Sequence, residues 1–271
     1  MVELKKNEEQ LKDEVMGKIN LSKDKVNLEK HVVSLTKTVV DLSKKNDVDL
    51  GSTKAKVVVA LDYSGSMRGL YGNGTVQDTL DRLVPLGLTF DDNGSIDVYL
   101  FENGCRKFDD LTIDNYEDYV HEVIDKSDYS MGGTNYANVL RAIIFGEKHS
   151  EVVEKRGFLG LGKKKVVKEV SDNAIVSNDQ PTFVIFITDG ENSDEFETTD
   201  VIKKASKENV FIQFIGIGRE NFRYLKKLDT LEGRDRDNTG FVQLEKLDEA
   251  SDSDLYTSVL SQFAAWLNGE Q

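Results

Sequence analysis

Five short apolar runs, rich in β-branched and aromatic residues, constrain the fold of this chain more than any other feature. They occupy residues 55–62 (AKVVVALD), 96–102, 182–189, 210–218 and, more weakly, 240–245. A run that is apolar at successive positions is typical of a strand with both faces buried. Helical patterns separate the runs, at 76–87, 115–125, 135–147, 198–208 and 254–267. This alternation predicts an α/β fold with a doubly wound, mostly parallel central sheet flanked by helices.

The first 50 residues carry a different pattern, which predicts an N-terminal helical arm ahead of a main domain at 51–271. The apolar residues of this segment recur at the 4-3-4-3 spacing of one helical face, at Leu28, Val32, Leu35, Val39 and Leu42. The β-branched content and the Val-x-Leu steps of a seven-residue repeat favour a strand instead, but the long uninterrupted pattern favours a helix. We expect an amphipathic helix docked on the main domain, with a coiled coil to a partner chain as the alternative.

Charge is unevenly distributed along the chain, whose formal net charge is −14. Residues 55–149 and 181–271 each carry a net charge of −8, while residues 150–180 between them carry +1. This predicts an acidic domain interrupted by a surface-loop insert at 150–180. The acidic balance argues against nucleic-acid binding, which needs a basic face, and is compatible with a cation site.

Cys105 is the single cysteine, so neither an intrachain disulfide nor a cysteine zinc cage is expected. The first ten residues, MVELKKNEEQ, lack the apolar core of a secretory signal. No apolar run reaches the roughly 20 residues that span a bilayer. We therefore expect a cytoplasmic protein without a transmembrane segment.

Compact oxygen-bearing side chains gather in three loops at or beside predicted strand ends. Asp62, Ser64 and Ser66 follow the first strand in LDYSGSM, Thr134 begins a helix behind two glycines, and Asp189 ends the third strand in ITDG. Ligands of parallel sheets bind at the carboxyl ends of the strands, so these side chains are expected to converge there. Each segment alone could be a turn or a helix cap.

The chemistry of these five side chains predicts a site for a hard divalent cation. Mg²⁺ and Ca²⁺ prefer oxygen ligands, and Mg²⁺ usually keeps several waters. The three hydroxyls would bind the ion, while the two carboxylates would neutralise it directly or through water. We expect Mg²⁺, with Mn²⁺ or Ca²⁺ as alternatives.

These motifs resemble the von Willebrand factor A (vWA) family: DYSGS matches its D-x-S-x-S metal motif, GGT its threonine loop and ITDG its aspartate loop. The resemblance extends from about residue 55 to the C-terminus and implies a vWA fold, which is Rossmann-like, with a metal-ion-dependent adhesion site. It implies that Ser64, Ser66 and Thr134 contact the ion, with Asp62 and Asp189 close by. It also implies one coordination position left for an acidic residue of a protein partner.

A longer stretch, YGNGTVQDTLDRLVPLGLTFDDNGSIDVYLFEN, together with the ending DLYTSVLSQFAAWL, resembles the bacterial tellurium-resistance vWA proteins of the TerF type. This implies a binding module rather than an enzyme, within a bacterial stress-resistance system for tellurium and related toxic agents. The alternatives are a metal-dependent phosphohydrolase that uses Asp62 and an extracellular vWA adhesin. Against the phosphohydrolase, the D-x-S-x-S pattern lacks the further aspartate and the lysine that aspartyl-phosphate chemistry requires. The missing signal sequence disfavours the adhesin.

The insert contains GFLGLGKK, in which Gly157, Gly162 and Lys163 satisfy the spacing of a phosphate-binding loop. The next residue is Lys164, where such loops carry the Ser or Thr that holds Mg²⁺. A surface loop is therefore the better interpretation, with Phe158 and Leu161 available to touch a partner or an anionic surface.

Overall fold

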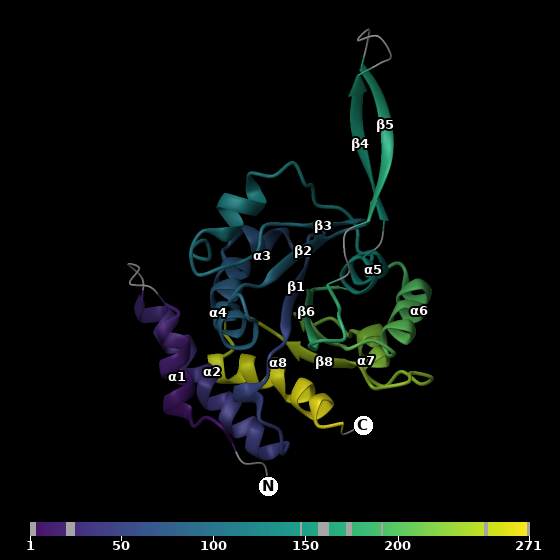
Figure 1. Cartoon of the computed structure of the whole chain (residues 1–271). Coiled ribbons are helices and arrows are strands. Elements are labelled where there is room, and N and C mark those ends of the chain that lie inside the picture. The colour runs from purple at the N-terminus through teal and green to yellow at the C-terminus, as the bar shows by residue number, and fades with distance from the viewer. Residues whose placement is uncertain are drawn as a thin grey trace.

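The centre of the molecule is a six-stranded sheet in the order β3-β2-β1-β6-β7-β8 (Figure 1). The structure is a computed structural model that describes residues 4–19, 25–146, 148–156, 163–171, 175–190, 192–246 and 249–269. The strands are β1 (Lys56–Asp62), β2 (Asp97–Phe101), β3 (Cys105–Lys107), β6 (Thr182–Thr188), β7 (Val210–Ile217) and β8 (Thr239–Leu244). All run parallel except the short edge strand β3, which is antiparallel to β2. The predicted α/β fold with a mostly parallel sheet is confirmed.

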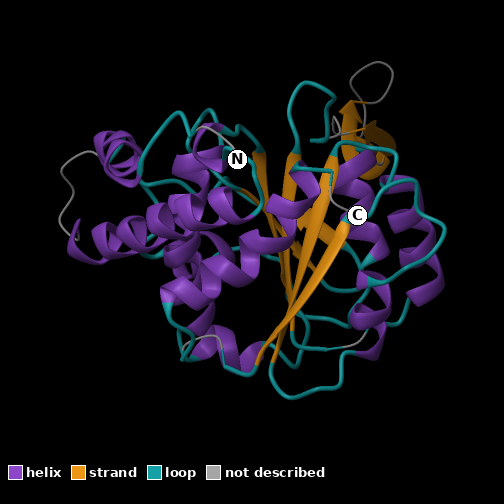
Figure 2. Cartoon of the chain, turned by 90° about the horizontal axis from the view of Figure 1, so that it is seen from below, coloured by secondary structure: helices purple, strands orange, loops and turns teal. Residues whose placement is uncertain are grey.

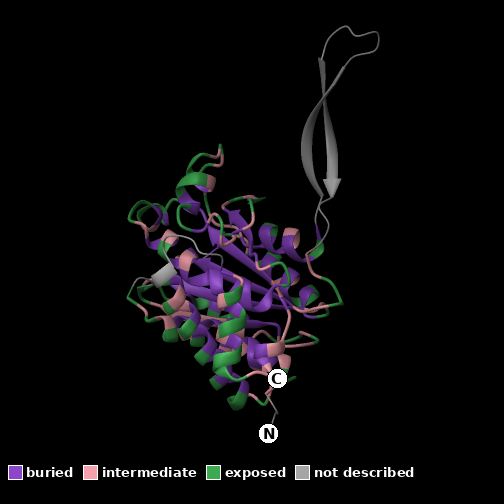
Figure 3. Cartoon of the chain, turned by 60° about the vertical axis from the view of Figure 1, so that its left-hand side comes forward, coloured by how far each residue is buried: buried purple, intermediate pink, exposed green. Residues whose placement is uncertain are grey.

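Helices cover both faces of this sheet (Figure 2). One face packs against α3 (Arg68–Gly72), α4 (Thr75–Phe90) and α8 (Asp252–Leu267), and the other against α5 (Ala137–Phe145), α6 (Glu195–Ala205) and α7 (Arg223–Asp229). Successive side chains of a strand point to opposite faces. Val57, Val59 and Leu61 accordingly join the first core, while Val58 and Ala60 join the second. Residues 57–62 of β1 are all buried, and the apolar ones supply both cores, as the sequence indicates. Buried residues gather in the sheet at the centre of the molecule (Figure 3).

The N-terminal arm forms two helices, α1 (Glu8–Gly17) and α2 (Lys25–Lys45), followed by a short 3-10 turn, η1 (Leu50–Ser52). The five predicted apolar positions of α2, from Leu28 to Leu42, are at most 4% exposed. They belong to the same core as α4 and α8, against which α2 packs. The expected amphipathic helix docked on the main domain is therefore confirmed, and the separate helix α1 is an addition.

The helix predicted at 115–125 is shorter than expected. A single π-helical segment, η2 (Val120–Asp125), occupies its second half. Before it, the Asn115 side chain accepts hydrogen bonds from the N–H and hydroxyl of Thr112 and donates to the carbonyl of Asp110. These bonds stabilise a turn, and Asn and Asp side chains commonly compete with helix in this way.

The insert differs from the expected surface loop because it contains regular structure. Strands β4 (Lys148–Arg156) and β5 (Lys163–Ser171) pair antiparallel and form a sheet of their own. This hairpin extends away from the body of the molecule (Figure 1). Residues 157–162, with Gly157, Phe158, Leu161 and Gly162, lie outside the described part of the chain.

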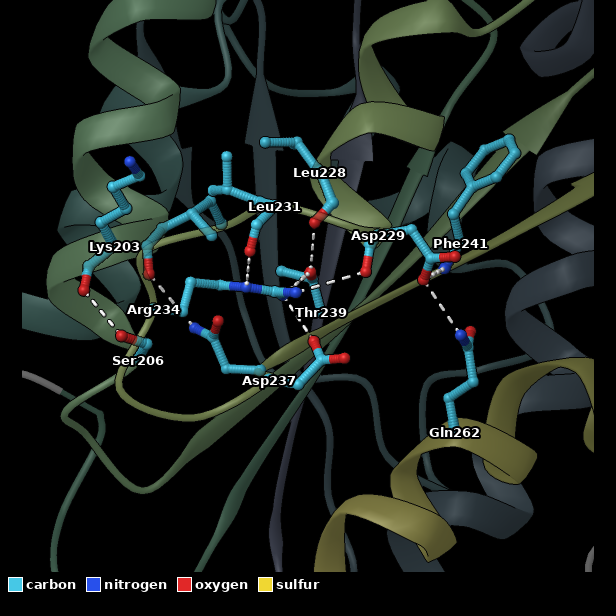
Figure 4. Close-up of polar contacts among 12 residues, drawn as sticks. Lys203, Ser206, Leu228, Asp229, Leu231, Arg234, Asp237, Thr239, Phe241 and Gln262 are labelled. Carbon is cyan, nitrogen blue, oxygen red and sulfur yellow. Dashed lines mark hydrogen bonds and ion pairs between the residues drawn. The ribbon is translucent and has the colours of Figure 1, made fainter. Parts of the chain in front are cut away.

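A polar cluster around Arg234 holds the connection between α7 and β8 (Figure 4). The Arg234 guanidinium donates to the Leu231 carbonyl at 2.7 Å and to the Thr239 hydroxyl at 2.6 Å, and it pairs with Asp237 at 2.5 Å. Asp229 accepts bonds from the N–H of Phe241 and the amide of Gln262, the latter on α8. These contacts position the last strand of the sheet and give the cluster a structural role.

Candidate metal centre

The first loop of the candidate site begins where β1 ends, at Asp62. This side chain is fully buried, and both of its oxygens accept hydrogen bonds. Oδ1 accepts from the Ser64 N–H at 2.8 Å, and Oδ2 accepts from the Thr188 hydroxyl at 2.6 Å. The Ser64 and Ser66 hydroxyl oxygens are 3.0 Å apart. The D-x-S-x-S segment therefore folds back on its own carboxylate and brings its two hydroxyls together.

The second loop, which carries Thr134, runs beside the first. Ser64 and Gly132 form a parallel bridge, and the Gly65 N–H donates to the Gly132 carbonyl at 3.1 Å. A Cβ atom on Gly132 would lie 2.3 Å from Glu102 Oε2, and one on Gly133 would lie 2.5 Å from Asn103 Oδ1. The two glycines thus let the loop lie against the residues that follow β2.

The third loop follows β6 and joins the other two. The Ser66 hydroxyl donates to Asp189 Oδ1 at 2.8 Å, and the Ser193 N–H donates to the Thr134 carbonyl at 2.9 Å. The Asp194 carboxylate accepts from the backbone N–H groups of Tyr136 and Ala137, at 2.9 and 2.8 Å. Asp194 therefore caps the start of α5 and fixes the position of the threonine loop.

All five residues predicted for the site lie in this cluster of loops. Side-chain and backbone hydrogen bonds connect Asp62, Ser64, Ser66 and Asp189 in series, and Thr134 joins through its backbone. Ser66 is exposed and Asp189 half-buried, so the cluster opens to solvent above the buried Asp62.

Three supporting residues were not predicted. Thr188 holds Asp62, and the buried Tyr136 hydroxyl donates to the Gly190 carbonyl at 2.5 Å and lies 3.2 Å from the Thr188 hydroxyl. Asp194 caps α5 from a position 57 residues further along the chain. Thr188 lies beside Asp189 in ITDG, and Tyr136 follows Thr134 in GGTNY. This closeness to the predicted site residues is the sequence signal that could have identified both. The role of Asp194 depends on a long-range contact that spacing does not reveal.

The electrostatics of the site favour a cation. Burial raises the pKa of Asp62 to about 6, against the lowering effect of its bonds to Ser64 and Thr188, and the charge of Asp189 raises it further. Burial also raises the pKa of Asp189, and the charge of Glu220 adds to this effect. The neighbouring charges that raise these two pKa values are thus acidic, and a bound cation would stabilise both carboxylates in their ionised form.

The donor set fits a hard divalent cation. Two carboxylates and three hydroxyls offer oxygen alone, the ligand type preferred by Mg²⁺, Mn²⁺ and Ca²⁺. Among the residues that the structure describes, no three or more His, Cys, Asp or Glu side chains are grouped so as to hold a metal, either at this cluster or away from it. Soft-metal chemistry at this cluster is disfavoured by its ligands.

No helix within the described ranges is both long and apolar enough to cross a bilayer.

Comparison with known proteins identifies relatives of the chain. Residues 54–271 match the family model described as the vWA domain found in the TerF C terminus, and the match begins after the N-terminal arm. The uncharacterized protein YcbR of Bacillus subtilis (strain 168) is 34% identical over 220 residues, which are 80% of this chain and 79% of YcbR.

Two solved structures show weaker similarity. Proximal thread matrix protein 1 of the mussel byssus is 16% identical, with a TM-score of 0.49 over 78% of this chain and 48% of that protein. The ArnB paralog VWA2 of Sulfolobus acidocaldarius is 17% identical, with a TM-score of 0.43 over 77% of this chain and 45% of that protein. The chain thus spans about half the length of these two proteins. On the strength of the family model and YcbR, the chain belongs to the family of vWA domains found at the C terminus of TerF.

Proposed function

We propose that the protein is a divalent-cation-dependent protein-binding module. Ser64, Ser66 and Thr134 would contact a Mg²⁺ ion, with Asp62 and Asp189 neutralising it directly or through water. An acidic side chain of a protein partner would take a remaining coordination position. The observation that best supports this proposal is the convergence of the three loops. The Ser66 hydroxyl donates to Asp189, and the Thr134 loop forms backbone hydrogen bonds with both of the other loops.

The surface beside the cluster suits protein contact. Phe196 lies in the first turn of α6, just after the third loop, and is 84% exposed. It is the most exposed large apolar side chain in the described part of the chain. An aromatic side chain next to a charged contact point is a common anchor in protein interfaces.

Calorimetric titration with Mg²⁺ and Mn²⁺ tests the metal assignment. Asp62→Ala and Thr134→Ala should each raise the dissociation constant at least tenfold, which corresponds to about 1.4 kcal/mol. Thr257→Ala, which removes an exposed hydroxyl from α8, is the matched control and should bind normally. Circular dichroism would verify that the variants fold. Unchanged affinity in both site variants would contradict the assignment.

A pull-down with the purified protein tests partner binding. Capture of a specific protein should require Mg²⁺, should be abolished by a chelator, and should be lost in Thr134→Ala. Capture that is insensitive to both the chelator and the variant would place the partner elsewhere on the surface.

The alternative of a phosphohydrolase is disfavoured by the geometry of Asp62. A nucleophilic carboxylate needs a free oxygen that faces substrate, whereas Asp62 is fully buried with both oxygens hydrogen-bonded. A phosphatase assay with Mg²⁺ should therefore show no turnover that depends on Asp62.

We further infer, from family membership alone, a role in a bacterial resistance system for tellurium and related toxic agents, in the cytoplasm. Deletion of the gene should increase sensitivity to tellurite, and fractionation should recover the protein in the cytoplasmic fraction. Recovery at the cell surface would instead favour an adhesin.

A further inference from the structure

The hairpin β4–β5 differs in charge from the rest of the molecule. Between residues 148 and 171 the chain has seven Lys or Arg and three Glu, a net charge of 7 − 3 = +4. Since the whole chain carries −14, the remainder carries −14 − 4 = −18. A strongly basic element on a strongly acidic body is a source of attraction between copies.

The strand register concentrates the positive charge at one end of the hairpin. Nearer the body, Glu151 pairs in register with Lys168, and Glu154 with Lys165. At the end furthest from the body, Lys155 pairs with Lys164, and Arg156 with Lys163. The register therefore places four basic residues at the end of the hairpin furthest from the body, where an acidic partner would be attracted.

The surface around the candidate metal centre has the opposite sign. Glu195 and Glu197, in the first turn of α6, are exposed, as is Glu220 after β7, whose charge acts on Asp189. The exposed Phe196 lies between the two glutamates of α6. This face, defined here as the acidic face by Glu195, Phe196, Glu197 and Glu220, offers an anionic rim with one apolar anchor.

We propose that the basic hairpin of one copy docks on the acidic face of a second copy, so that the protein associates head to tail. The hairpin extends away from its own body, which favours a contact between molecules (Figure 1). Strands of nine residues span about 30 Å, several times the Debye length of about 8 Å at physiological salt. The repulsion between two acidic bodies is therefore screened while the hairpin makes contact. Because hairpin and face are different surfaces, the contact is heterologous and propagates to rings or filaments.

This inference rests on the proposed function in one respect, that the docking face is the one around the metal centre. Sedimentation velocity on the full chain tests it. The wild type should form species heavier than the 30.4 kDa monomer at low salt and dissociate at about 0.5 M salt, where the Debye length is a few ångströms. A wild type that is monomeric at every salt concentration, or that binds phosphatidylglycerol vesicles without self-association, would overturn the proposal.

Two charge-reversal variants locate the contact. The hairpin variant combines Lys163→Glu, Lys164→Glu and Lys165→Glu, and the face variant combines Glu195→Lys, Glu197→Lys and Glu220→Lys. Each should be monomeric alone, and an equimolar mixture should associate again because opposite charges then meet at both kinds of contact. The matched control combines Lys30→Glu, Lys37→Glu and Lys44→Glu, which changes the net charge equally at exposed positions of α2, and it should associate like the wild type.

The controls separate this inference from the metal assignment. Normal Mg²⁺ binding by a monomeric hairpin variant supports both proposals. Association without any Mg²⁺ binding by the wild type would overturn the metal assignment and leave the docking contact intact. Persistent association of the hairpin variant, or a mixture that stays monomeric, would overturn the docking contact.

Discussion

At the scale of single residues, Asp62 shows how a buried carboxylate can order the first loop of the proposed metal centre. Its two oxygens accept hydrogen bonds from the Ser64 N–H and the Thr188 hydroxyl, which fixes the conformation of the loop. Burial raises the pKa of Asp62 to about 6. Preorganisation of this kind reduces the free-energy cost of ordering the ligands when a cation binds.

A half-buried acid, Asp81 on α4, leads to a prediction about pH. Burial raises its pKa from 3.8 to about 7, while Gln77 lowers it and the charges of Asp78 and Glu117 raise it. Between these two pKa values the folded chain binds more protons than the unfolded chain, so the contribution of Asp81 to stability decreases as pH rises from about 4 to about 7. Asp81→Asn removes that contribution.

The melting temperature of Asp81→Asn should therefore increase relative to the wild type over this pH range and remain higher above pH 7. Thermal unfolding at several pH values measures the difference. Asp41→Asn, at an exposed position of α2, is the matched control and should follow the wild type throughout. A constant difference between Asp81→Asn and the wild type would show that Asp81 does not titrate in this range.

The sequence predicts the convergence of the five candidate residues better than the contacts that support them. Their convergence was predictable because each combines a recognisable residue type with a position at or beside a strand end; the five are Asp62, Ser64, Ser66, Thr134 and Asp189. Thr188 and Asp62 are 126 residues apart, and their bond depends on the register of β1 against β6. Such contacts depend on tertiary packing, so no pattern of nearby residues in the sequence indicates them.

At the scale of elements, the arm is fastened by polar contacts as well as by its apolar face. His31 Nδ1 on α2 lies 2.7 Å from Asp252 Oδ2, while Arg82 Nε on α4 donates to Asp252 Oδ1 at 2.8 Å. Asp252 begins α8, where an acidic side chain also interacts favourably with the helix dipole. One carboxylate thus connects three helices of the same layer.

Leu35→Asp tests whether this arm stabilises the whole domain. Leu35 is fully buried, so the substitution places a charge in the core and should cost at least about 3 kcal/mol. That loss corresponds to a decrease of roughly 10 °C in melting temperature at this chain length. Val33→Asp, on the same helix but 40% exposed, should change stability by no more than about 0.5 kcal/mol. Equal effects of the two variants would show that α2 is not fixed on the domain.

The hairpin should contribute little to the stability of the body. Its strands pair with each other and form a sheet separate from the central one. Replacement of residues 148–171 by a short Gly/Ser linker should leave the melting temperature nearly unchanged, since loop length affects stability weakly. A decrease of more than about 10 °C, equivalent to several kcal/mol, would show that the hairpin packs on the core.

Helices and strands were predictable where the apolar pattern extends over many residues. The buried strands and the apolar face of α2 were found because many consecutive positions repeat the same signal. Strand β3, with three residues, and helix α7, with seven, are too short to show a repeating apolar pattern. The hairpin was missed because its strands are charged and pair outside the main sheet, so they lack the apolar pattern of the other strands.

At the scale of the whole molecule, the fold joins distant parts of the chain into one layer. The core that α2 enters also contains side chains of β1, α4 and α8. The family model begins at residue 54, so the arm lies outside the matched residues, and its side chains complete this layer. Exposing its apolar face would leave a large apolar patch on the surface.

The packing of α2 on α8 also has a consequence for synthesis of the protein. The two helices are separated by about 200 residues, from Lys45 to Asp252, so the contact between them cannot form until both are available. At roughly 5–20 residues per second, a ribosome needs about ten seconds or more to make the intervening chain. During that time only α1, η1 and α4 are available to cover the apolar face of α2, and closure of the layer follows the appearance of α8.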